Sequence, residues 1–576
     1  MAGHSPANGS SGSGPRGVLN MVERIGNRLP DPAILFMMGA ALVMLCSAIA
    51  AWGGMSVQPK KLVVRTEAIV DAAGTPVIDP ESGQPQVREV FDASGEPVLD
   101  LVANGDAITP RNLLSADGLY YAISSMVDNF VNFPPLGIVL VGVLGIGIAE
   151  RTGFIGAALK AVMLVVPKRL LTPAMVFLGI MSSLGTDAGY VVLPPVAAAL
   201  YKSVGRSPLA GIAAVFAGVA AGFNANLLIT SLDPLLAGLT SQAGQTIDVN
   251  YRLEPTANWF FMIVSTVVIS LTGWLVSDLF VEKRLRLRAP DDGGPSPVSS
   301  EELAAQRMDA VEQKGLVAGT ITIVLATLVF VLFTLVPGGP FDDSLGKMGA
   351  TPGLVRGADH FDRWIESIVP MLFILFILPG VVHGVIVGKL RSGKDLAALM
   401  VDTMAYMAPI IVLAFFAAQF IEYFKYSNLD KMLAHWGGQQ LAASGLGAMP
   451  LMVAFILVTA VFNLFVGSMS AKYAMFAPIF VPMFMLVGIS PALTQAAYRI
   501  GDSVSNVITP LNSYLIIILV VMQKYAPRAG MGTLIAMMMP YTIVFGIVWT
   551  LMLLIWMWTG TPLGPGGALE YVPPAH

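Results

Sequence analysis

Long apolar stretches separated by short polar segments dominate this chain. A helix needs about 20 apolar residues to cross the hydrocarbon core of a bilayer. The stretches of that length predict an all-α polytopic membrane protein with about nine transmembrane helices. They cover residues 31–53, 132–167, 207–232, 257–281, 314–336, 366–388, 397–424, 491–522 and 532–558. The stretch at 132–167 contains Glu150 and Arg151, so it forms either one kinked helix or two shorter helices.

Polar residues interrupt two further apolar stretches, 171–202 and 450–487, near their middles. Basic residues flank the first of them on both sides, and basic residues gather on the cytoplasmic side of membrane proteins. Both ends of 171–202 are therefore expected in the cytoplasm, which predicts a re-entrant hairpin. The second stretch then predicts another re-entrant hairpin, open to the opposite side. The flanking residues are Lys168, Arg169, Lys202 and Arg206.

The segments between the apolar stretches divide the chain into regions. Basic residues before the first stretch place the N-terminus in the cytoplasm. A turn-rich motif at 71–79 recurs at 92–100 and predicts short β-hairpins outside the membrane. The expected regions are a cytoplasmic tail at 1–30, the first transmembrane helix at 31–53, an extracytoplasmic loop at 54–118, membrane repeat 1 at 119–288, a cytoplasmic linker at 289–313, membrane repeat 2 at 314–558 and a C-terminal tail at 559–576.

A polar hairpin followed by an interrupted span occurs twice along the chain. Within the interruptions, Gly222 precedes Thr230 by the same spacing as Gly501 precedes Thr509. Irregular polar segments at membrane depth must line a cavity, because lipid cannot satisfy their backbone groups. Two such units with opposite orientation predict an inverted-repeat secondary transporter.

Composition supports the membrane assignment. Of the 576 residues, 55% are hydrophobic and only 12% are charged, whereas soluble proteins carry about 25% charged residues. These values exclude ordinary soluble enzymes, fibrous proteins and disordered proteins. The net charge of −4 gives no reason to expect nucleic acid as a partner. A single cysteine and five histidines without metal-ligand spacing argue against a zinc or di-iron site, so no resident cofactor is expected.

Charged residues within the apolar regions are the first candidates for function. Asp187 lies at the tip of the first hairpin, where it either caps a half-helix or serves a substrate, an ion or a proton. Arg499 and Asp502 lie three positions apart on one helical face. They form a structural ion pair, or Arg499 binds a substrate carboxylate while Asp502 tunes it or carries a proton. Lys472 is expected to extend toward water, and Asp233 fits a loop or helix-end role.

The coupling ion is left open by these residues. Asp187 and Asp502 offer sites for a proton. Side-chain oxygens near the hairpins and interruptions suit Na⁺ at the hairpin tips instead. The oxygen-bearing residues are Ser182, Ser183, Asn224, Asn226, Ser468, Asn506 and Thr509. Three prolines are expected to break helices, namely Pro194, Pro478 and Pro510.

At these same residues the chain resembles the AbgT family, the p-aminobenzoyl-glutamate transporters. The resemblance runs from about residue 17 to 560 and is densest in the strings SSLGTDAGYVVLPP, NLFVGSMSAKYAMFAPIFVPMF and YRIGDSVSNVITPLNSY. It implies a homodimer whose protomers each have nine spans and two re-entrant hairpins, with a transport core against a dimerisation scaffold. It also implies use of an ion gradient. Family members import p-aminobenzoyl-glutamate or expel sulfonamide antimetabolites.

The resemblance also implies which residues serve transport. They are Asp187, Asn463, Ser470, Pro491, Arg499, Asp502 and Pro510. The family's tryptophan in the second hairpin is replaced by Tyr473, which still stacks on an aromatic ring but adds a hydroxyl. This departure bears on affinity or substrate preference. p-Aminobenzoyl-glutamate has an aromatic ring and two carboxylates, features that Tyr473, Arg499 and the N-termini of half-helices match.

The expected function is secondary active transport of p-aminobenzoyl-glutamate and related aryl-amide or sulfonamide compounds, driven by H⁺ or Na⁺. The expected location is the bacterial inner membrane, and no enzymatic activity is expected. One alternative is a dicarboxylate transporter of similar architecture, and another is a channel. A third is an intramembrane aspartyl protease that uses Asp187 and Asp502. The residues around these two carboxylates, with Arg499 beside the second, argue against the protease.

Overall fold

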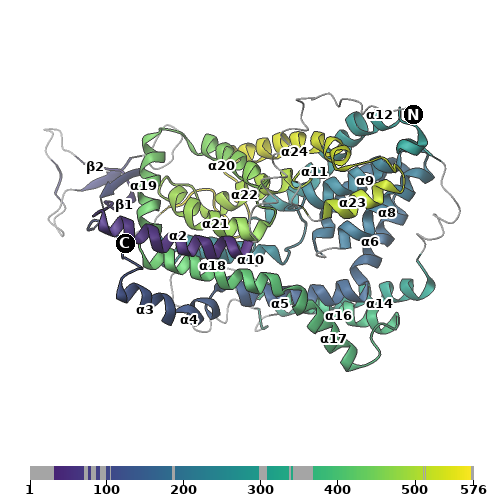
Figure 1. The fold of residues 1–576 in the computed structure, drawn as a ribbon, viewed down its shortest axis with the longest axis horizontal. Coiled ribbons are helices and arrows are strands. Elements are labelled where there is room, and N and C mark those ends of the chain that lie inside the picture. The colour runs from purple at the N-terminus through teal and green to yellow at the C-terminus, as the bar shows by residue number, and fades with distance from the viewer. Residues whose placement is uncertain are drawn as a thin grey trace, which may run out of the picture.

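The computed structural model describes residues 32–69, 76–78, 86–90, 99–103, 105–184, 188–296, 308–336, 339–341, 363, 367–509, 512 and 514–572. Most of these residues are helical, as the apolar stretches predicted. Figure 1 shows the helices in two groups, one above the other, that both run along the long axis of the molecule, and short strands lie at one end.

The first group holds helices from both halves of the chain. In it, α2 packs on α18, α5 packs on α16 and α17, and α16 also packs on α14 (Figure 1). The bounds are α2 (Pro32–Trp52), α5 (Pro134–Thr152), α14 (Ala310–Leu335), α16 (Ile368–Ile386), α17 (Gly393–Tyr406) and α18 (Ala408–Tyr426). The helices that directly precede or follow members of this group along the chain are α3 (Ala116–Ser124), α4 (Met126–Val131), α6 (Phe154–Val165) and α19 (Leu429–Ala443).

The second group contains the two interrupted regions. Its helices are α7 (Leu171–Met181), α8 (Ala188–Ser203), α9 (Pro208–Phe216), α10 (Leu232–Gly244), α11 (Trp259–Val276), α12 (Glu282–Leu285), α20 (Ala448–Phe462), α21 (Met469–Met485), α22 (Pro491–Ser505), α23 (Tyr514–Gln523) and α24 (Met531–Thr559). Short π-helical turns, η3 (Ala217–Ala221) and η4 (Ser277–Val281), extend α9 and α11. Short 3-10 turns are η1 (Lys168–Leu170), η2 (Ser182–Leu184) and η5 (Pro290–Asp292).

Within the described residues, 6 helices are long and apolar enough to cross a membrane. They are α2, α11 with its continuation to Leu285, α14, α16, α18 and α24. Counted together as one span, α5 and α6 make a seventh crossing, bent by 65° where the two helices meet. Gly153 ends α5 there with a φ of 97°, a left-handed conformation that glycine adopts without strain. The stretch at 132–167 therefore forms two helices rather than one straight helix.

The stretch at 397–424 was expected to form one span, but it breaks at Met407 between α17 and α18. Pro409 lies in the first turn of α18, where its missing N–H costs no helical hydrogen bond. A helix running continuously through this proline would lose a hydrogen bond and clash with the preceding turn. Only α18, the second part, is long and apolar enough to span a bilayer.

The proline predictions for the hairpins also differ from the structure. Helix α8 continues through Pro194, and α21 continues through Pro478, so neither residue breaks its helix. Neighbouring helices can compensate for the backbone hydrogen bond that a proline removes from a membrane helix. Pro510, the third expected helix breaker, lies outside the described residues.

The described residues between α2 and α3 contain four short strands. β1 (Lys60–Val64) pairs with β4 (Leu99–Ala103), and β2 (Thr66–Ala68) pairs with β3 (Val87–Glu89), both antiparallel. The amide of Lys60 donates to His435 Nδ1 over 3.3 Å, which ties the strands to α19 (Figure 1). Much of the sequence repeat that suggested hairpins here lies outside the described residues.

The two interrupted regions pack in a reciprocal way. Helix α10, from the first half, packs on α21 from the second, and α23 from the second half packs on α8 from the first. Each half also contains a close crossing at a glycine. A Cβ at Gly222 would lie 2.7 Å from Ile180 of α7, and a Cβ at Gly501 would lie 2.5 Å from the carbonyl oxygen of Ile456 in α20. These crossings bring both interruptions to the centre of the second group.

Candidate substrate site

Helix α22 is the centre of the polar site. All of its residues are buried, although it carries Gln495, Arg499 and Asp502 on its surface. Ser490 caps its N-terminus by accepting a hydrogen bond from the amide of Leu493 over 3.0 Å. Pro491 follows in the first turn, where its fixed φ favours helix initiation. The polar side chains of α22 therefore need partners from neighbouring elements.

Arg499 finds its partner in the first half of the chain. Its Nη2 lies 2.6 Å from Asp233 Oδ1, and both side chains are buried. The other oxygen of Asp233 accepts from the amide of Thr230 over 2.6 Å, which joins the first turn of α10 to the segment just before it. Arg499 Nη2 also donates to Gln495 Oε1 over 3.3 Å. The expected alternative of an Arg499–Asp502 pair is therefore not the one observed, and Asp233 does more than end a helix.

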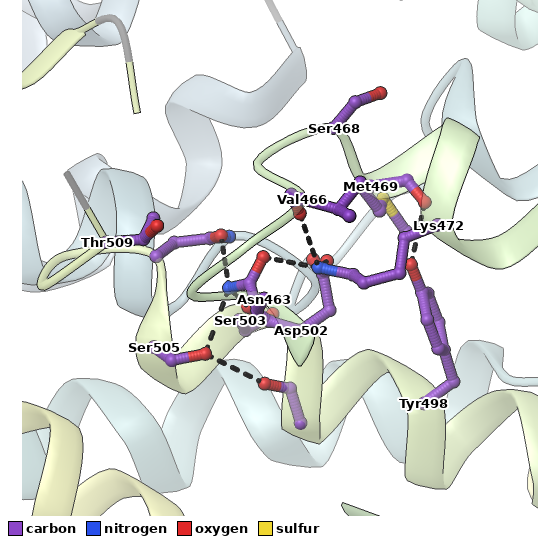
Figure 2. Close-up of polar contacts among 12 residues, drawn as sticks. Asn463, Val466, Ser468, Met469, Lys472, Tyr498, Asp502, Ser503, Ser505 and Thr509 are labelled. Atoms are coloured by element: carbon purple, nitrogen blue, oxygen red, sulfur yellow. Dashed lines mark hydrogen bonds and ion pairs between the residues drawn. The ribbon is translucent and has the colours of Figure 1, made fainter. Parts of the chain in front are cut away.

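Asp502 pairs with Lys472 of α21 (Figure 2). Lys472 Nζ lies 2.7 Å from Asp502 Oδ1, and both side chains have an exposure of 0%. The same ammonium contacts Asn463 Oδ1 and the carbonyl oxygen of Val466. The expectation that Lys472 extends to water is wrong, because the turn between α20 and α21 surrounds its end with oxygen atoms (Figure 2).

Two asparagines join Asp502 to both halves of the chain. Asn463 Nδ2 donates to the Asp502 carbonyl oxygen over 2.7 Å and to Ser505 Oγ over 2.9 Å. Asn224 Nδ2 donates to Asp502 Oδ2 over 3.2 Å and to Ser503 Oγ over 2.7 Å. Asn224 comes from the first interruption and Asn463 from the turn before α21. The two buried ion pairs thus belong to one network, and their charges cancel.

A cavity of about 230 Å³ lies beside this network, where both hairpin tips and both interruptions meet the first helix group. Tyr190 and Tyr514 stack at its wall, with ring centroids 4.0 Å apart and planes inclined by 6°. Its lining combines these aromatic rings with amide and hydroxyl groups. The lining residues are Val143, Ser183, Tyr190, Phe223, Ser231, Leu232, Leu235, Tyr406, Met407, Ile410, Gly467, Met469, Asn506, Asn512 and Tyr514.

Tyr473 lies apart from this cavity. Its exposure is 0%, and its hydroxyl lies 2.6 Å from Thr240 Oγ1 of α10. Its ring packs against Tyr498, with centroids 4.5 Å apart. In this conformation Tyr473 joins α21 to α10 and does not line the cavity.

The other predicted site residues have varied positions. Ser183 and Asn506 line the cavity, and Asn226 Nδ2 donates to Ser183 Oγ over 2.8 Å. Ser182 donates to the carbonyl oxygen of Gly179, and Ser468 caps α21. Thr509 Oγ1 lies 3.5 Å from the carbonyl oxygen of Leu464, and Ser470 is half-buried on α21. Asp187 and Pro510 lie outside the described residues.

Sequence patterns missed several residues of the network. Gln495 bonds both Arg499 and Thr240, and its spacing of four from Arg499 on one helix was a signal that could have revealed it. Asp233, Asn258 and Thr240 gave no such local signal, because their partners are distant in sequence. In the part of the chain that the structure describes, no group of three His, Cys, Asp or Glu side chains could hold a metal ion.

Comparison with known proteins places this arrangement in a family. The family model described as "AbgT putative transporter family" matches residues 17–571. The chain belongs to the AbgT family. The resemblance seen in its hairpin motifs is therefore confirmed over nearly the whole chain.

Relatives of known identity support the AbgT assignment. The chain is 32% identical over 546 residues to the p-aminobenzoyl-glutamate transport protein of Escherichia coli K12, covering 95% of each chain. The YdaH transporter of Alcanivorax borkumensis is 33% identical with a TM-score of 0.76, over 93% of this chain and 100% of YdaH. MtrF of Neisseria gonorrhoeae, described among antimetabolite efflux pumps, is 37% identical with a TM-score of 0.76, over 94% of this chain and 97% of MtrF.

This AbgT protein is a multi-pass membrane transporter and not an enzyme. The aspartyl protease alternative is therefore excluded. Its chemistry needs two carboxylates that share a proton, whereas Asp502 is paired with the Lys472 ammonium.

Proposed function

We propose that this protein is a secondary active transporter of p-aminobenzoyl-glutamate and related aryl-amide or sulfonamide compounds. The observation that supports this most is the position of the 230 Å³ cavity between two interrupted regions, beside two buried ion pairs. The names of the E. coli relative and of MtrF point to the same class of substrate. A purely aliphatic dicarboxylate would gain little from the Tyr190–Tyr514 stack.

The cavity offers complementary groups for such a substrate. The two stacked tyrosines suit an aryl ring, and Asn506 and Asn512 suit an amide. Arg499 Nε is buried and has no hydrogen-bond partner among the described residues, so it can donate to a carboxylate. Ser231 and Leu232 line the cavity directly before Asp233, which places the ion pair just behind the cavity wall. A substrate carboxylate would compete with Asp233 for Arg499.

The membrane topology is part of the proposal. Nine spans and two re-entrant hairpins, related as inverted repeats, agree with the reciprocal packing of α10 on α21 and α23 on α8. The N-terminus lies in the cytoplasm, and the protein forms a homodimer in the bacterial inner membrane. The 6 long apolar helices supply the continuous spans, and shorter helices around the interruptions supply the remainder.

An ion gradient drives transport in this proposal, and the contacts of Asp502 favour the proton. A proton on Asp502 would cancel its charge and leave Lys472 with only the neutral oxygens of Asn463 and Val466. Protonation would therefore weaken the ion pair that holds α21 against α22 and favour separation of the two helices. A Na⁺ ion would instead need several oxygens. Those of Ser505 and Asn506 already accept hydrogen bonds from Asn463 Nδ2, and Asn463 Oδ1 accepts one from Lys472.

Uptake into liposomes tests the proposal. Purified protein is reconstituted, and labelled p-aminobenzoyl-glutamate is followed under a pH gradient and, separately, under a Na⁺ gradient. We expect saturable movement driven by the pH gradient and lost in Arg499→Gln. The control Lys394→Gln changes an exposed cation at the start of α17. Substrate movement driven only by the Na⁺ gradient would show that Na⁺, and not the proton, is the coupling ion. No movement of this substrate by folded protein would refute the substrate assignment.

A further inference from the structure

A second and larger cavity, of about 810 Å³, lies between the end of α11–α12 and the start of α24. It shares no lining residue with the cavity beside Asp502. Its walls come from residues 280–288 of the first segment and 528–540 of the second. Arg284, Arg288 and Arg528 contribute three guanidinium groups to this one cavity.

The carboxylates close to these arginines are already paired with other cations. Asp278 Oδ1 lies 2.6 Å from Arg206 Nη2, and Glu282 contacts both Arg206 and Arg286. Asp291 and Asp292 follow on an exposed turn and do not line the cavity. Arg284, Arg288 and Arg528 form no ion pair with a residue that the structure describes. The cavity therefore has a local excess of positive charge.

The first turn of α24 adds to this positive potential. Gly530 caps the helix, Gly532 lies in its first turn, and both line the cavity. A Cβ built on either glycine would meet nothing within 4 Å, so no neighbouring group covers the backbone there. The N–H groups at a helix N-terminus bind anions, and phosphate groups are frequent ligands. Arginine adds bidentate hydrogen bonds to phosphate oxygens.

The remaining walls of the cavity are apolar. Phe280, Ile535, Met537 and Met539 extend from the arginines along α11–α12 and α24. Phe280 is 56% exposed, and both helices are among those long enough to cross a membrane. A soluble anion would use the arginines but leave these apolar walls without a partner. A phospholipid would use both, because its phosphate and its acyl chains lie in this order along the membrane normal.

We propose that this cavity binds an anionic phospholipid. Arg284, Arg288 and Arg528, together with the first turn of α24, hold the phosphate, and the acyl chains lie along Phe280 and Met537. Basic pockets between transmembrane helices on the cytoplasmic side are known to suit anionic headgroups. The excess of positive charge selects lipids with a net negative charge over zwitterionic ones. The site is separate from the proposed substrate cavity and does not depend on the transported compound.

Native mass spectrometry of the delipidated full-length protein tests this site. Phosphatidylglycerol and phosphatidylcholine are titrated separately in a neutral detergent. A basic side chain near a membrane surface contributes about a fivefold gain in affinity for anionic lipid. The variant Arg284→Gln/Arg528→Gln is therefore expected to bind phosphatidylglycerol about 30-fold more weakly than wild type.

A matched control separates a defined site from general attraction. Lys283→Gln/Lys524→Gln removes the same charge from exposed neighbours that do not line the cavity, and we expect it to retain wild-type affinity. Equal loss in the two double variants would overturn the proposal, as would equal binding of the two lipids. Inorganic phosphate that displaces phosphatidylglycerol at similar concentration would show a soluble-anion site instead. Thermal unfolding of each variant, which we expect to match wild type, confirms that a loss of binding is not a loss of folding.

Discussion

Arg499 of α22 and Asp233 of α10 form a buried ion pair across 266 positions of the chain, with 2.6 Å between Arg499 Nη2 and Asp233 Oδ1. The pair joins the two halves of the molecule just behind the wall of the candidate substrate cavity. Neither residue has another partner of opposite charge among the described residues. Any substrate that draws Arg499 into the cavity must therefore weaken the connection between α10 and α22.

The Arg499–Asp233 pair predicts a stability effect. Asp233→Asn leaves the Arg499 guanidinium buried without a counter-charge, and breaking a buried pair in this way costs about 3–5 kcal/mol. The double variant Asp233→Asn/Arg499→Gln should recover much of this loss, because no unpaired charge remains. Thermal unfolding in detergent measures both effects. Asp106→Asn, on an exposed loop, is the control, and an unchanged unfolding temperature in Asp233→Asn would contradict the prediction.

The Lys472–Asp502 pair predicts an effect on coupling. Asp502→Asn keeps the size of the side chain, and its amide oxygen can still accept from Lys472, but it cannot gain and lose a proton. We expect exchange of internal and external substrate to continue while accumulation driven by a pH gradient is abolished. Liposomes assayed in exchange mode and in gradient mode distinguish these activities. Full gradient-driven accumulation by Asp502→Asn would show that Asp502 does not carry the coupled proton.

Tyr514 and Tyr473 are expected to have different roles, the first in substrate recognition and the second in helix packing. Tyr514→Leu removes one ring of the cavity stack, and aromatic contacts contribute about 0.5–1.5 kcal/mol beyond buried area. The KM for p-aminobenzoyl-glutamate should rise about two- to tenfold. Tyr473→Phe removes only the hydroxyl bonded to Thr240, so it should lower stability by about 1 kcal/mol and leave KM unchanged. A rise in KM caused by Tyr473→Phe would instead indicate that the Tyr473 hydroxyl contacts the substrate.

Sequence patterns were sufficient for some levels of this architecture and not for others. The helical class and the polar interruptions were visible because lipid forbids unpaired polar groups, so each deviation from apolar sequence is informative. The ion pairs were not visible, because local spacing favoured Arg499–Asp502 while the folded chain offers Asp233 and Lys472. Partners brought together by tertiary packing leave no periodic signal. The same reason explains why Tyr473, next to Lys472 in sequence, faces α10 and not the cavity.

Asp430 predicts a pH dependence of stability outside the membrane-spanning helices. It lies on α19, and burial raises its pKa to about 6, an effect that the amide of Lys431 only partly offsets. Since the folded state then holds a proton that the unfolded state releases above about pH 4, stability attributable to Asp430 falls as the pH rises from about 4 to about 6 and stays lower above that. A neutral side chain avoids this penalty.

Asp430→Asn should therefore raise the unfolding temperature at pH 7.5 and leave it nearly unchanged at about pH 3, where wild-type Asp430 is largely protonated in both states. The amide can still accept the hydrogen bond that Thr246 Oγ1 donates to Asp430 Oδ2 over 3.3 Å. The difference in unfolding temperature between variant and wild type, measured across this pH range, isolates Asp430 from all other titrating groups. A difference that is constant with pH would mean that Asp430 titrates alike in the folded and unfolded chain, in contradiction to its burial beside the loop that follows α10.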